Sequence, residues 1–402
     1  MTHRVLFAAG LGLTLWAAAC QSDELNSPSA SPYGAMFQRY VAMGNSITAG
    51  VQSAGINDST QKQSYALLVG NAMRGDRFFY PSLNVPGCPP PFTNIFTGAR
   101  VGGAGVTGSS CFLRSAAIPP YISDVAVPGA ETVDMLTNGT PNSNPLTLLF
   151  LGGRTQVRAM MDARPTFVSV WAGNNDLLGA AELGDTTFAT DTAAFHTSYA
   201  RALDSIKATG ASAILIAVGL GHLSNNVVLP FFSRGTTWFG AISSGAFAPA
   251  PLSVAANCAP PRGDTVLVSF AYGFQLVAQA KGGTPTTLDC TAPPVDEPKE
   301  TRFFAALQLK YNAIIQAEAT TRGWAYTDSV NTTLDSLATV PGQFLPFPNI
   351  GNPSNPNGCA ANVFGAAFSC DGIHPSQATQ LKIAQKVIRA INAKYSSTIP
   401  TP

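Results

Sequence analysis

Strand-length runs of apolar residues alternate with segments of helical spacing along most of the chain. The helical segments carry apolar residues on one side, as in the repeat of Tyr65, Leu68 and Ala72. Apolar runs without alternating polar positions are typical of parallel strands buried on both faces, and the helices between them cover those faces. The pattern therefore predicts one α/β domain with a parallel sheet. We expect strands at 40–43, 124–127, 167–171, 213–218 and 324–327, and helices at 61–74, 148–161, 191–208, 304–323 and from 375 onward.

Two long stretches interrupt this rhythm, at about 76–121 and 222–300. Both are rich in glycine and proline, and each contains two cysteines. Loops of this length inside one domain usually serve as lids or binding loops. The second stretch is also rich in aromatic residues, which either fill the small core of a subdomain or face a substrate. These are Phe231, Phe232, Trp238, Phe239, Phe247, Phe270, Tyr272 and Phe274.

The first nineteen residues have the pattern of a secretory signal, with Arg4 before an apolar run at 5–16 and three alanines before Cys20. The Ala-Ala-Ala-Cys sequence resembles the lipobox of bacterial lipoproteins, in which the cysteine is diacylated. This resemblance implies an exported protein, anchored by lipid to a bacterial cell membrane on its periplasmic or cell-surface face. An ordinary cleavage site followed by an unrelated cysteine is the alternative. We expect the signal peptide at 1–19, the lipidated cysteine and a flexible tether at 20–37, and the folded body at 38–397.

Composition narrows the classes of protein that fit. Of 402 residues, 46% are hydrophobic and only 11% are charged, with 23 basic and 22 acidic side chains. The apolar content excludes a disordered chain, and the near-zero net charge argues against nucleic-acid binding, which needs a basic surface. Without Cys20, six cysteines are left, an even number that suggests three disulfides in an oxidising compartment. Several connectivities are open, and we expect the sequential pairs Cys88–Cys111, Cys258–Cys290 and Cys359–Cys370.

Histidine spacing gives no sign of a metal site, and glycine spacing gives none of a phosphate loop. None of the four histidines lies in a pair with the spacing of zinc ligands. The glycines of 102–108 lie in a cysteine-flanked stretch, and no Gly-Lys-Ser/Thr follows them. We therefore expect no metal and no cofactor.

Polar residues with the chemistry of acyl transfer follow several predicted strands. Ser46 follows the first strand in YVAMGNSITAG, Gly129 lies in DVAVPGA, and Asn175 lies in FVSVWAGNND. The carboxyl ends of parallel strands meet at one edge of a sheet, so these groups can share a site. Near the end of the chain, CDGIHPS places Asp371 and His374 three residues apart. That spacing lets the carboxylate orient the imidazole as a base.

Four sequence blocks in this order resemble those of the SGNH (GDSL-type) hydrolase family. GNSITAG is similar to the first block, AVPGAET to the second, GNND to the third and DGIH to the fifth. The resemblance runs from residue 40 to about 395. It implies a flavodoxin-like three-layer α/β/α sandwich, decorated here by the two long insertions. One departure is Asn45, which stands where the family has the aspartate of Gly-Asp-Ser.

The resemblance also implies a role for each matching residue. Ser46 would be the nucleophile, His374 its base, and Asp371 the group that stabilises the imidazolium. The oxyanion hole would consist of the backbone N–H groups of Ser46 and Gly129 and the side-chain amide of Asn175. The implied activity is hydrolysis of carboxylic esters through an acyl-serine, as in esterases and lipases.

Other functions use the same fold or the same residues. A catalytically silent binding lipoprotein would keep the fold without turnover, and an acyltransferase or carbohydrate O-acetylesterase would use the same serine. The expected substrate is an ester, whether a lipid, a short-chain ester or an acetylated carbohydrate, and the aromatic insertion favours an acyl chain or an aryl ester. The other expected partner is the membrane. We expect a monomer that binds no nucleic acid.

Overall fold

The computed structural model describes residues 30–111, 119–137, 144, 146–219, 230–245, 251–347 and 358–402. The predicted signal segment, Cys20, His222 and Phe247 lie outside the described residues. Among the described helices, none is long and apolar enough to cross a membrane.

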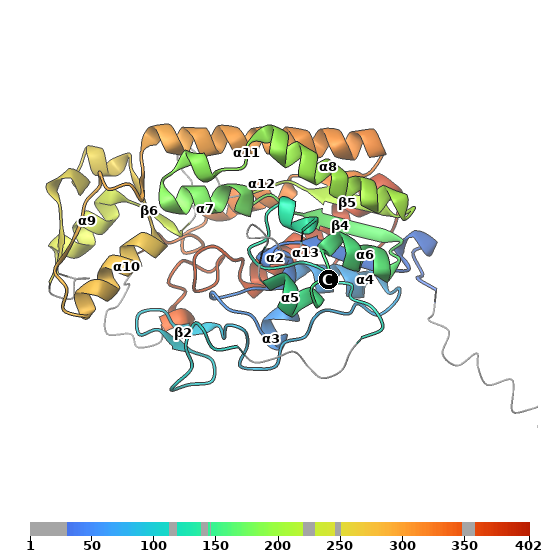
Figure 1. Ribbon diagram of the computed structural model, residues 1–402, viewed down its shortest axis with the longest axis horizontal. Helices are drawn as coiled ribbons and strands as arrows, with labels where there is room; N and C mark the ends of the chain where they lie inside the picture. Colours follow the sequence, from blue (N-terminus) through green and yellow to red (C-terminus); the bar gives the residue numbers. More distant parts are fainter. Residues whose placement is uncertain are drawn as a thin grey trace, which may run out of the picture.

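A four-stranded parallel sheet forms the middle layer of the main body, and two of its strands, β4 and β5, are labelled in Figure 1. Its strand order is β1-β4-β5-β11, and all three neighbouring pairs run parallel. Every residue of β1 and β4 is buried, as their unbroken apolar sequences predict. The strands are β1 (Tyr40–Gly44), β4 (Phe167–Trp171), β5 (Ser212–Ile216) and β11 (Ala325–Thr327).

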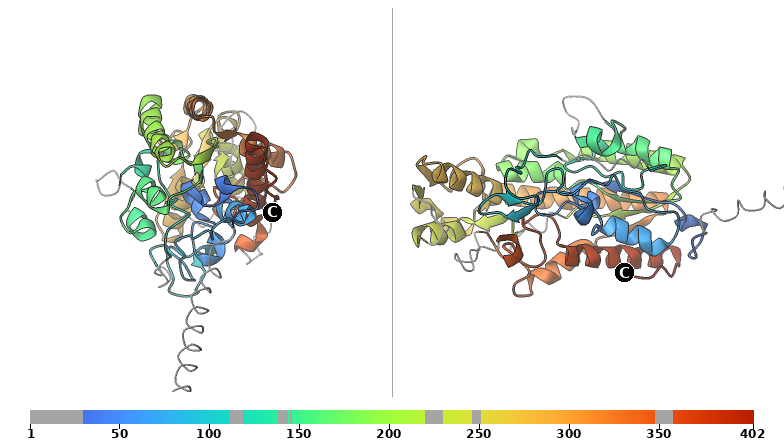
Figure 2. Two further views of the ribbon diagram at one scale, coloured as in Figure 1. Left: turned by 90° about the vertical axis from the view of Figure 1, so that its right-hand side faces the viewer. Right: turned by 90° about the horizontal axis from the view of Figure 1, so that it is seen from below.

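Helices cover both faces of this sheet (Figure 2). Successive residues of a strand point to opposite faces. Accordingly, Phe167 and Trp171 pack under one pair of helices, whereas Val168 and Val170 belong to the core beneath the helices of the other face. The structure thus confirms the three-layer α/β/α architecture. One face carries α4 (Tyr65–Met73) and α13 (Gln377–Tyr395), and the other carries α6 (Gln156–Ala163), α8 (Thr192–Ala208) and α11 (Pro298–Arg322).

The segment 124–127 is not the regular strand that its apolar run predicts. It forms one isolated parallel bridge to β1, at Asp124. The backbone N–H groups of Val125 and Val127 still donate to the carbonyls of Ala42, at 2.9 Å, and Gly44, at 3.2 Å. The segment therefore runs along the free edge of β1 and brings the turn that follows it to the carboxyl end of the sheet.

Two predicted helices are shorter than expected. The helix predicted at 148–161 is divided into α5 and α6 by Gly152 and Gly153, which have φ values of +62° and +81°. Such left-handed conformations end a helix, and glycine adopts them without strain. The helix predicted at 61–74 begins only at Tyr65, after the hydroxyl of Ser64 caps it by accepting from the Leu67 N–H.

Shorter elements complete the main body. Two of them, α7 and α12, lie over the carboxyl ends of the strands, although the apolar pattern did not predict them. These elements are η2 (Ala35–Phe37), α2 (Ser46–Ala49), α3 (Asp58–Gln61), β2 (Phe92–Asn94), β3 (Ala99–Arg100), η3 (Val133–Met135), α5 (Leu146–Leu151), α7 (Asn175–Leu183), η4 (Thr186–Phe188), α12 (Ser329–Ala338) and η7 (Gly358–Ala361).

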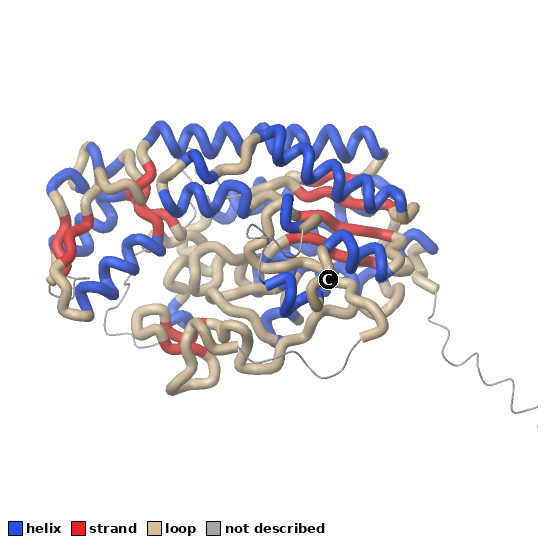
Figure 3. Tube along the Cα trace, in the orientation of Figure 1, coloured by secondary structure: helices blue, strands red, loops and turns tan. Residues whose placement is uncertain are grey.

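The second insertion forms a small subdomain at one end of the molecule, drawn in yellow in Figure 1 and visible in Figure 3 as short strands among helices. It contains a three-stranded antiparallel sheet of order β10-β8-β6 and a two-stranded parallel sheet of β7 and β9. Its elements are β6 (Phe232–Arg234), α9 (Gly235–Ser243), β7 (Leu252–Val254), η5 (Ala256–Cys258), η6 (Arg262–Asp264), β8 (Leu267–Ser269), α10 (Phe270–Lys281), β9 (Thr286–Leu288) and β10 (Val295–Asp296).

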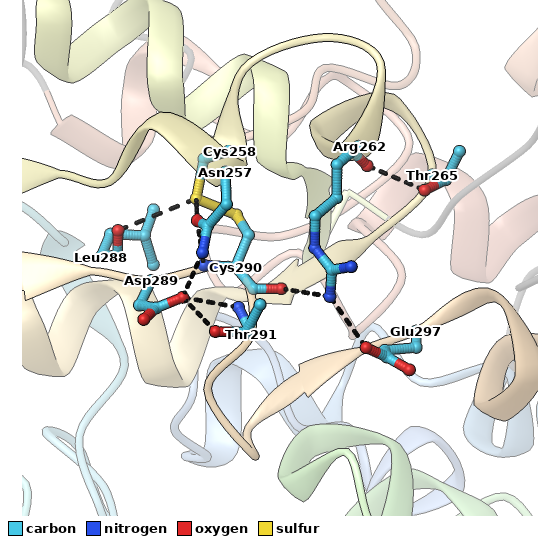
Figure 4. The surroundings of a disulfide bond; sticks show 9 residues. All are labelled: Asn257, Cys258, Arg262, Thr265, Leu288, Asp289, Cys290, Thr291 and Glu297. Carbon is cyan, nitrogen blue, oxygen red and sulfur yellow. Dashed lines mark hydrogen bonds and ion pairs between the residues drawn. A yellow bond between two sulfur atoms is a disulfide. The ribbon is translucent and has the colours of Figure 1, made fainter.

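Three disulfides have the sequential pairing, Cys88–Cys111, Cys258–Cys290 and Cys359–Cys370. Figure 4 shows the second of them inside the subdomain. Beside it, the Asn257 amide donates to the Asp289 carboxylate at 2.7 Å. The Arg262 guanidinium joins the Cys290 carbonyl, at 3.3 Å, to the Glu297 carboxylate, at 2.8 Å, just before α11.

The aromatic residues of the subdomain pack into a shared core. Trp238 lies 5.2 Å from Phe347 between ring centroids, and Phe270 contacts both Phe347, at 4.9 Å, and Phe364, at 5.4 Å. Phe347 and Phe364 belong to the segments that lead to the predicted Asp371–His374 motif. These contacts favour the interpretation in which the aromatic residues form a core that joins the subdomain to the main body.

The packed body is longer than the predicted range of 38–397. Ser31 is buried, and its hydroxyl donates to the Met73 carbonyl at 2.7 Å. At the other end, Ile399 is buried, and its carbonyl accepts from the Asn392 amide at 2.8 Å. Residues 31–37 are therefore part of the folded body and not of the predicted tether.

Candidate active site

Ser46 is the first residue of α2, directly after β1. Gly44, two residues earlier, has no room for a side chain, because a Cβ there would lie 2.4 Å from the Thr48 hydroxyl and 2.6 Å from the Trp171 carbonyl. The side chain of Gln156, which is fully buried, forms hydrogen bonds with both backbone groups of this glycine. Its side-chain oxygen accepts from the Gly44 N–H at 3.0 Å, and its amide donates to the Gly44 carbonyl at 2.9 Å. The backbone that presents Ser46 is thus fixed by packing and by two buried hydrogen bonds.

Asn45 caps the short helix that Ser46 begins. Its side-chain oxygen accepts from the Ile47 N–H at 3.2 Å, and the side chain is almost fully buried. Asparagine and aspartate cap helices about equally well. Asn45 therefore supplies the acceptor that an aspartate would supply at this position, without burying a negative charge beside Ser46.

Asp371 and His374 form the hydrogen-bonded pair that their spacing predicts. Asp371 Oδ2 lies 2.7 Å from His374 Nδ1, which leaves Nε2 free of this carboxylate. Burial alone would raise the pKa of Asp371, but the charge of His374 and the hydrogen bonds from His374 and Ala54 lower it to about 2. The carboxylate is therefore ionised well below neutral pH, and its contact with Nδ1 fixes the orientation of the imidazole.

Further donors surround the same carboxylate. The backbone N–H groups of Ile373 and His374 donate to Oδ1 at 3.0 and 2.9 Å, and the Ser369 hydroxyl donates to Oδ1 at 3.1 Å. The Ala54 N–H donates to Oδ2 at 2.6 Å. Ala54 lies in the loop that follows α2, so the loop behind the predicted nucleophile directly contacts the predicted acid.

Asn175 contacts the loop that contains Gly129. It is the first residue of α7, four residues after the end of β4, and its amide donates to the Ala130 carbonyl at 2.9 Å. The amide has two N–H groups, so this bond orients the side chain and leaves one donor for a ligand. Gly129 is exposed and adopts a φ of +77°, a conformation that glycine reaches without strain.

Asp176 ties this loop to α7. Its buried carboxylate accepts from the Thr132 N–H at 2.9 Å and from the Thr132 hydroxyl at 2.7 Å. Burial raises the pKa of Asp176, and the hydrogen bonds from Thr132 oppose that effect. The Asp of the GNND block therefore has a structural task here, which is to hold the 129–132 loop against the helix that carries Asn175.

A pocket beside Ser46 brings these elements together. Its polar lining comes from Asn45, Ser46, Asn174 and Asn175, and the residues on either side of His374 also line it. The apolar part of its wall comes from Trp171, Leu178, Val330, Leu334, Phe368 and Ile383. The structure thus places the Ser46 turn, the α7 N-terminus and the His374 loop around one cavity.

Gln380 of α13 links the Ser46 helix to the helix that follows His374. Its amide donates to the Ile47 carbonyl at 3.2 Å, and its side-chain oxygen accepts from the Tyr65 N–H at 3.0 Å. Gln156 and Gln380 were not singled out from the sequence, because a neutral polar residue in a helix is usually a surface residue. Their burial and their partners depend on tertiary structure.

Glu182 is a further residue that the motifs did not indicate. It lies seven residues after Asn175, and this spacing puts both residues on the same side of α7. Burial raises the pKa of Glu182 to about 7, and the charge of His374 opposes that rise. The helical spacing from Asn175 was the one available signal of a position near the site.

His196, which lacks a carboxylate at short spacing in the sequence, pairs with Glu318 of α11 in the structure, at 2.5 Å from its Nε2. It is half exposed on α8 and has no bond to Ser46 or Asp371. Among the described residues, no group of three or more histidine, cysteine, aspartate or glutamate side chains could hold a metal ion.

Comparisons with known proteins give structural likeness only. No protein-family model and no curated protein matches the chain. Among solved structures, the chain is similar to TesA, with 12% identity and a TM-score of 0.36 over 89% of this chain and 99% of that one. It is also similar to Axe2, an acetylxylan esterase from Geobacillus stearothermophilus, with 11% identity and a TM-score of 0.37 over 92% of this chain and 96% of that one.

A third similar structure is LAE5, an alpha/beta hydrolase enzyme from the metagenome of Lake Arreo, Spain. It has 12% identity and a TM-score of 0.37, over 91% of this chain and 96% of that one. Because these TM-scores are low, no property of this chain is inferred from these structures. The chemistry of the site rests on the geometry of the chain's own residues.

Proposed function

We propose that this protein is a serine hydrolase that cleaves carboxylic esters through an acyl-serine intermediate. One observation carries the proposal. The Asp371 carboxylate binds Nδ1 of His374 at 2.7 Å, and the loop that holds this pair lines the same pocket as Ser46 and Asn175. A nucleophile, an oriented base and an amide donor around one cavity are the parts that acyl transfer needs.

The reaction begins when Ser46 Oγ attacks the ester carbonyl and its proton passes to His374 Nε2. The ionised Asp371 stabilises the imidazolium that forms. Collapse of the tetrahedral intermediate breaks the bond to the alcohol oxygen, which takes the proton from His374. Water then attacks the acyl-serine, with His374 again as the base, and releases the carboxylic acid and the free serine.

The negative oxygen of the tetrahedral intermediate needs donors that are already in place. The backbone N–H groups of Ser46 and Gly129 and the free N–H of the Asn175 amide are suited to this role. Such a donor typically contributes about 2.7 to 4 kcal/mol to the transition state. The bonds of Asn175 to Ala130 and of Asp176 to Thr132 support the assignment, because they fix two of the three donors relative to each other.

The primary test uses protein that begins after Cys20 and a p-nitrophenyl ester. We expect hydrolysis by the wild type and a rate at least about a thousandfold lower for Ser46→Ala and His374→Ala. His196→Ala is the matched control, because it removes an imidazole that pairs with Glu318 outside the pocket. Wild-type rates in both Ser46→Ala and His374→Ala would overturn the proposal.

A fluorophosphonate probe separates hydrolysis from binding without turnover. We expect covalent labelling of Ser46 in the wild type and none in Ser46→Ala. A silent binding protein would give no labelling of either. Product analysis with an added alcohol detects acyl transfer to that alcohol, which would assign the same residues to a transferase.

The proposal includes attachment to a membrane through acylated Cys20. The Ala-Ala-Ala-Cys sequence supports it, and Ser31, the start of the packed body, lies eleven positions after Cys20. A segment of that length spans at most about 40 Å, so the active site would work close to the membrane surface. In cells, Cys20→Ser should move the protein to the soluble fraction with its esterase activity intact.

A further inference from the structure

The pocket beside Ser46 lies at the carboxyl ends of the strands. Two of its lining residues, Trp171 at the end of β4 and Ile383 of α13, are nearly inaccessible to solvent. Val330 and Leu334, one helical turn apart on α12, form another part of the wall. A substrate group that enters past Ser46 therefore meets mainly aliphatic and aromatic carbon.

The position of His374 indicates which part of an ester this pocket takes. In the proposed reaction, His374 must protonate the departing alcohol oxygen, so the alcohol lies on the His374 side of Ser46. Ile373 and Pro375 line the pocket, but His374 itself is not among the described residues that do. Ser46 and Asn175 do line it. The pocket is therefore placed to receive the acyl group, which stays on Ser46 after the alcohol has left.

The size of the pocket limits the length of that acyl group. The pocket offers about 30 Å³ to the centres of water-sized groups. One water needs about 10–15 Å³ on this measure, so the cavity holds about two or three small groups in a row. An acyl tail of that length is an acetyl to butyryl group, whereas a lipid chain would project out of the pocket.

The described part of the aromatic subdomain contributes no wall to this cavity. Of the described residues that line it, none lies between 230 and 300. Trp238 and Phe270 instead pack against Phe347 and Phe364. The prediction that the aromatic insertion favours an acyl chain or an aryl ester thus has no support in the described lining of the pocket.

We propose that the end of β4 together with α12 and α13 forms a pocket for a short aliphatic acyl group of about two to four carbons, and that Val330 and Leu334 set its length. This assignment rests on the proposed ester hydrolysis and adds the class of acyl group that is accepted. Each methylene that the pocket buries increases kcat/KM about fourfold, and selectivity declines once the acyl chain is longer than the pocket.

The experiment measures kcat/KM for p-nitrophenyl acetate, butyrate, hexanoate and octanoate, which share one leaving group. We expect the wild type to be most active on acetate or butyrate. Leu334→Ala should raise the ratio of hexanoate to acetate hydrolysis about tenfold, because it extends the pocket along α12. Val330→Leu should lower the ratio of butyrate to acetate hydrolysis about fourfold.

Leu337→Ala is the control for Leu334→Ala. Leu337 lies on the same helix and is about as buried, with 8% of its surface exposed against 7% for Leu334, but it does not line the pocket. It should lower thermal stability to a similar extent and leave the chain-length ratio unchanged.

The outcomes separate the two proposals. A wild type that hydrolyses none of the four esters and is not labelled by a fluorophosphonate contradicts ester hydrolysis itself. An active wild type that prefers octanoate overturns the acyl-pocket assignment alone, and so does an active Leu334→Ala whose ratio matches that of Leu337→Ala. Since Val330→Leu adds a methylene and leaves no cavity, it tests the assignment even where Leu334→Ala folds poorly.

Discussion

Hydrogen bonds join the loop of Ser53 to the loop of Ser369, although the two serines are 316 positions apart in the sequence. The Ser53 N–H donates to the Ser369 hydroxyl oxygen at 2.8 Å, and the Cys370 N–H donates to the Ser53 hydroxyl oxygen at 3.2 Å. The Ser369 hydroxyl in turn donates to Asp371. Ser53 and Ala54 have φ values of +54° and +49°, a left-handed conformation that costs about 1–2 kcal/mol per residue. The loop after Ser46 is thus kept in a strained shape while it contacts the acid of the site.

Removal of the Ser369 hydroxyl should lower kcat about fivefold to tenfold and leave KM nearly unchanged. The reason is that Asp371 loses one donor and its loop loses a link to the loop behind Ser46, a change worth about 1 to 1.5 kcal/mol. Steady-state kinetics of Ser369→Ala and Ser369→Thr checks this, and the threonine variant should recover most of the rate because it keeps the hydroxyl. The control is Ser376→Ala, which removes a hydroxyl that donates to the Ala366 carbonyl and not to Asp371, and its kcat should stay close to that of the wild type. Equal losses in the alanine and threonine variants would contradict the role of the hydroxyl.

Gln156→Leu should lower the free energy of unfolding by about 2 to 4 kcal/mol, because it leaves the buried N–H and carbonyl of Gly44 without their partners. It should also lower kcat, since the Gly44 backbone presents Ser46. Urea unfolding and ester kinetics measure the two effects. Gln316→Leu, an exposed change on α11, should alter stability by less than about 0.5 kcal/mol. A Gln156→Leu protein as stable as the wild type would show that water replaces the lost partners.

Asp371 should make stability depend on pH in acid. Its pKa is lowered from 3.8 to about 2 in the folded protein. A lowered pKa stabilises the fold above the unfolded pKa, and this contribution is lost as the pH falls through the folded pKa. The stability advantage of the wild type over Asp371→Asn should therefore be constant above about pH 5 and shrink by about 2 kcal/mol toward pH 2. Unfolding by urea at a series of pH values tests this, and a difference that does not vary with pH would contradict it.

Glu182 should influence the pH dependence of hydrolysis. Burial raises the pKa of Glu182 to about 7, so this carboxyl group changes its charge in the neutral range, where it interacts electrostatically with His374. Glu182→Gln removes that change of charge, so the pH profile of kcat/KM should differ from that of the wild type mainly between about pH 6 and 8. Glu131→Gln is the matched control. Burial and then the charges of Asp176 and Asp134 raise the pKa of Glu131 to about 7 as well, but His374 is not among its partners. Identical pH profiles of kcat/KM in the wild type and Glu182→Gln would contradict the coupling.

Much of the site could be predicted from the sequence because each part of it is local. Ser46 and Asn175 lie two and four residues after the ends of β1 and β4, whose apolar sequences are easily recognised as buried strands. Asp371 and His374 are three residues apart, so a single turn brings them together. The sequence also shows the Gly152–Gly153 pair that divides the helix predicted at 148–161, since glycine readily adopts the positive φ that ends a helix.

The remaining parts depend on contacts between distant residues. The α12 helix has the sequence SVNTTLDSLA, in which β-branched and short polar residues give low helix propensity. Its helical form comes from packing on α13. Nothing local marks Gln156, Gln380 or the Ser53–Ser369 link, because each has its effect only through a partner on another element. The acyl pocket could not be predicted for the same reason, since α12, α13 and β4 lie far apart in the sequence.

The core shared by the aromatic subdomain and the main body restricts how this protein could be re-engineered. A Cβ on Gly372, inside the DGIH block, would lie 2.7 Å from the Phe364 ring, so that ring is the surface on which the block rests. Phe364 packs in turn on Phe347 and Phe270. If the subdomain were exchanged for a shorter loop or for a module from another hydrolase, Phe347 and Phe364 would lose the ring of Phe270 that packs on them. A minimal version of the protein would therefore need a redesigned support beneath Phe364 before its specificity could be compared with that of the parent.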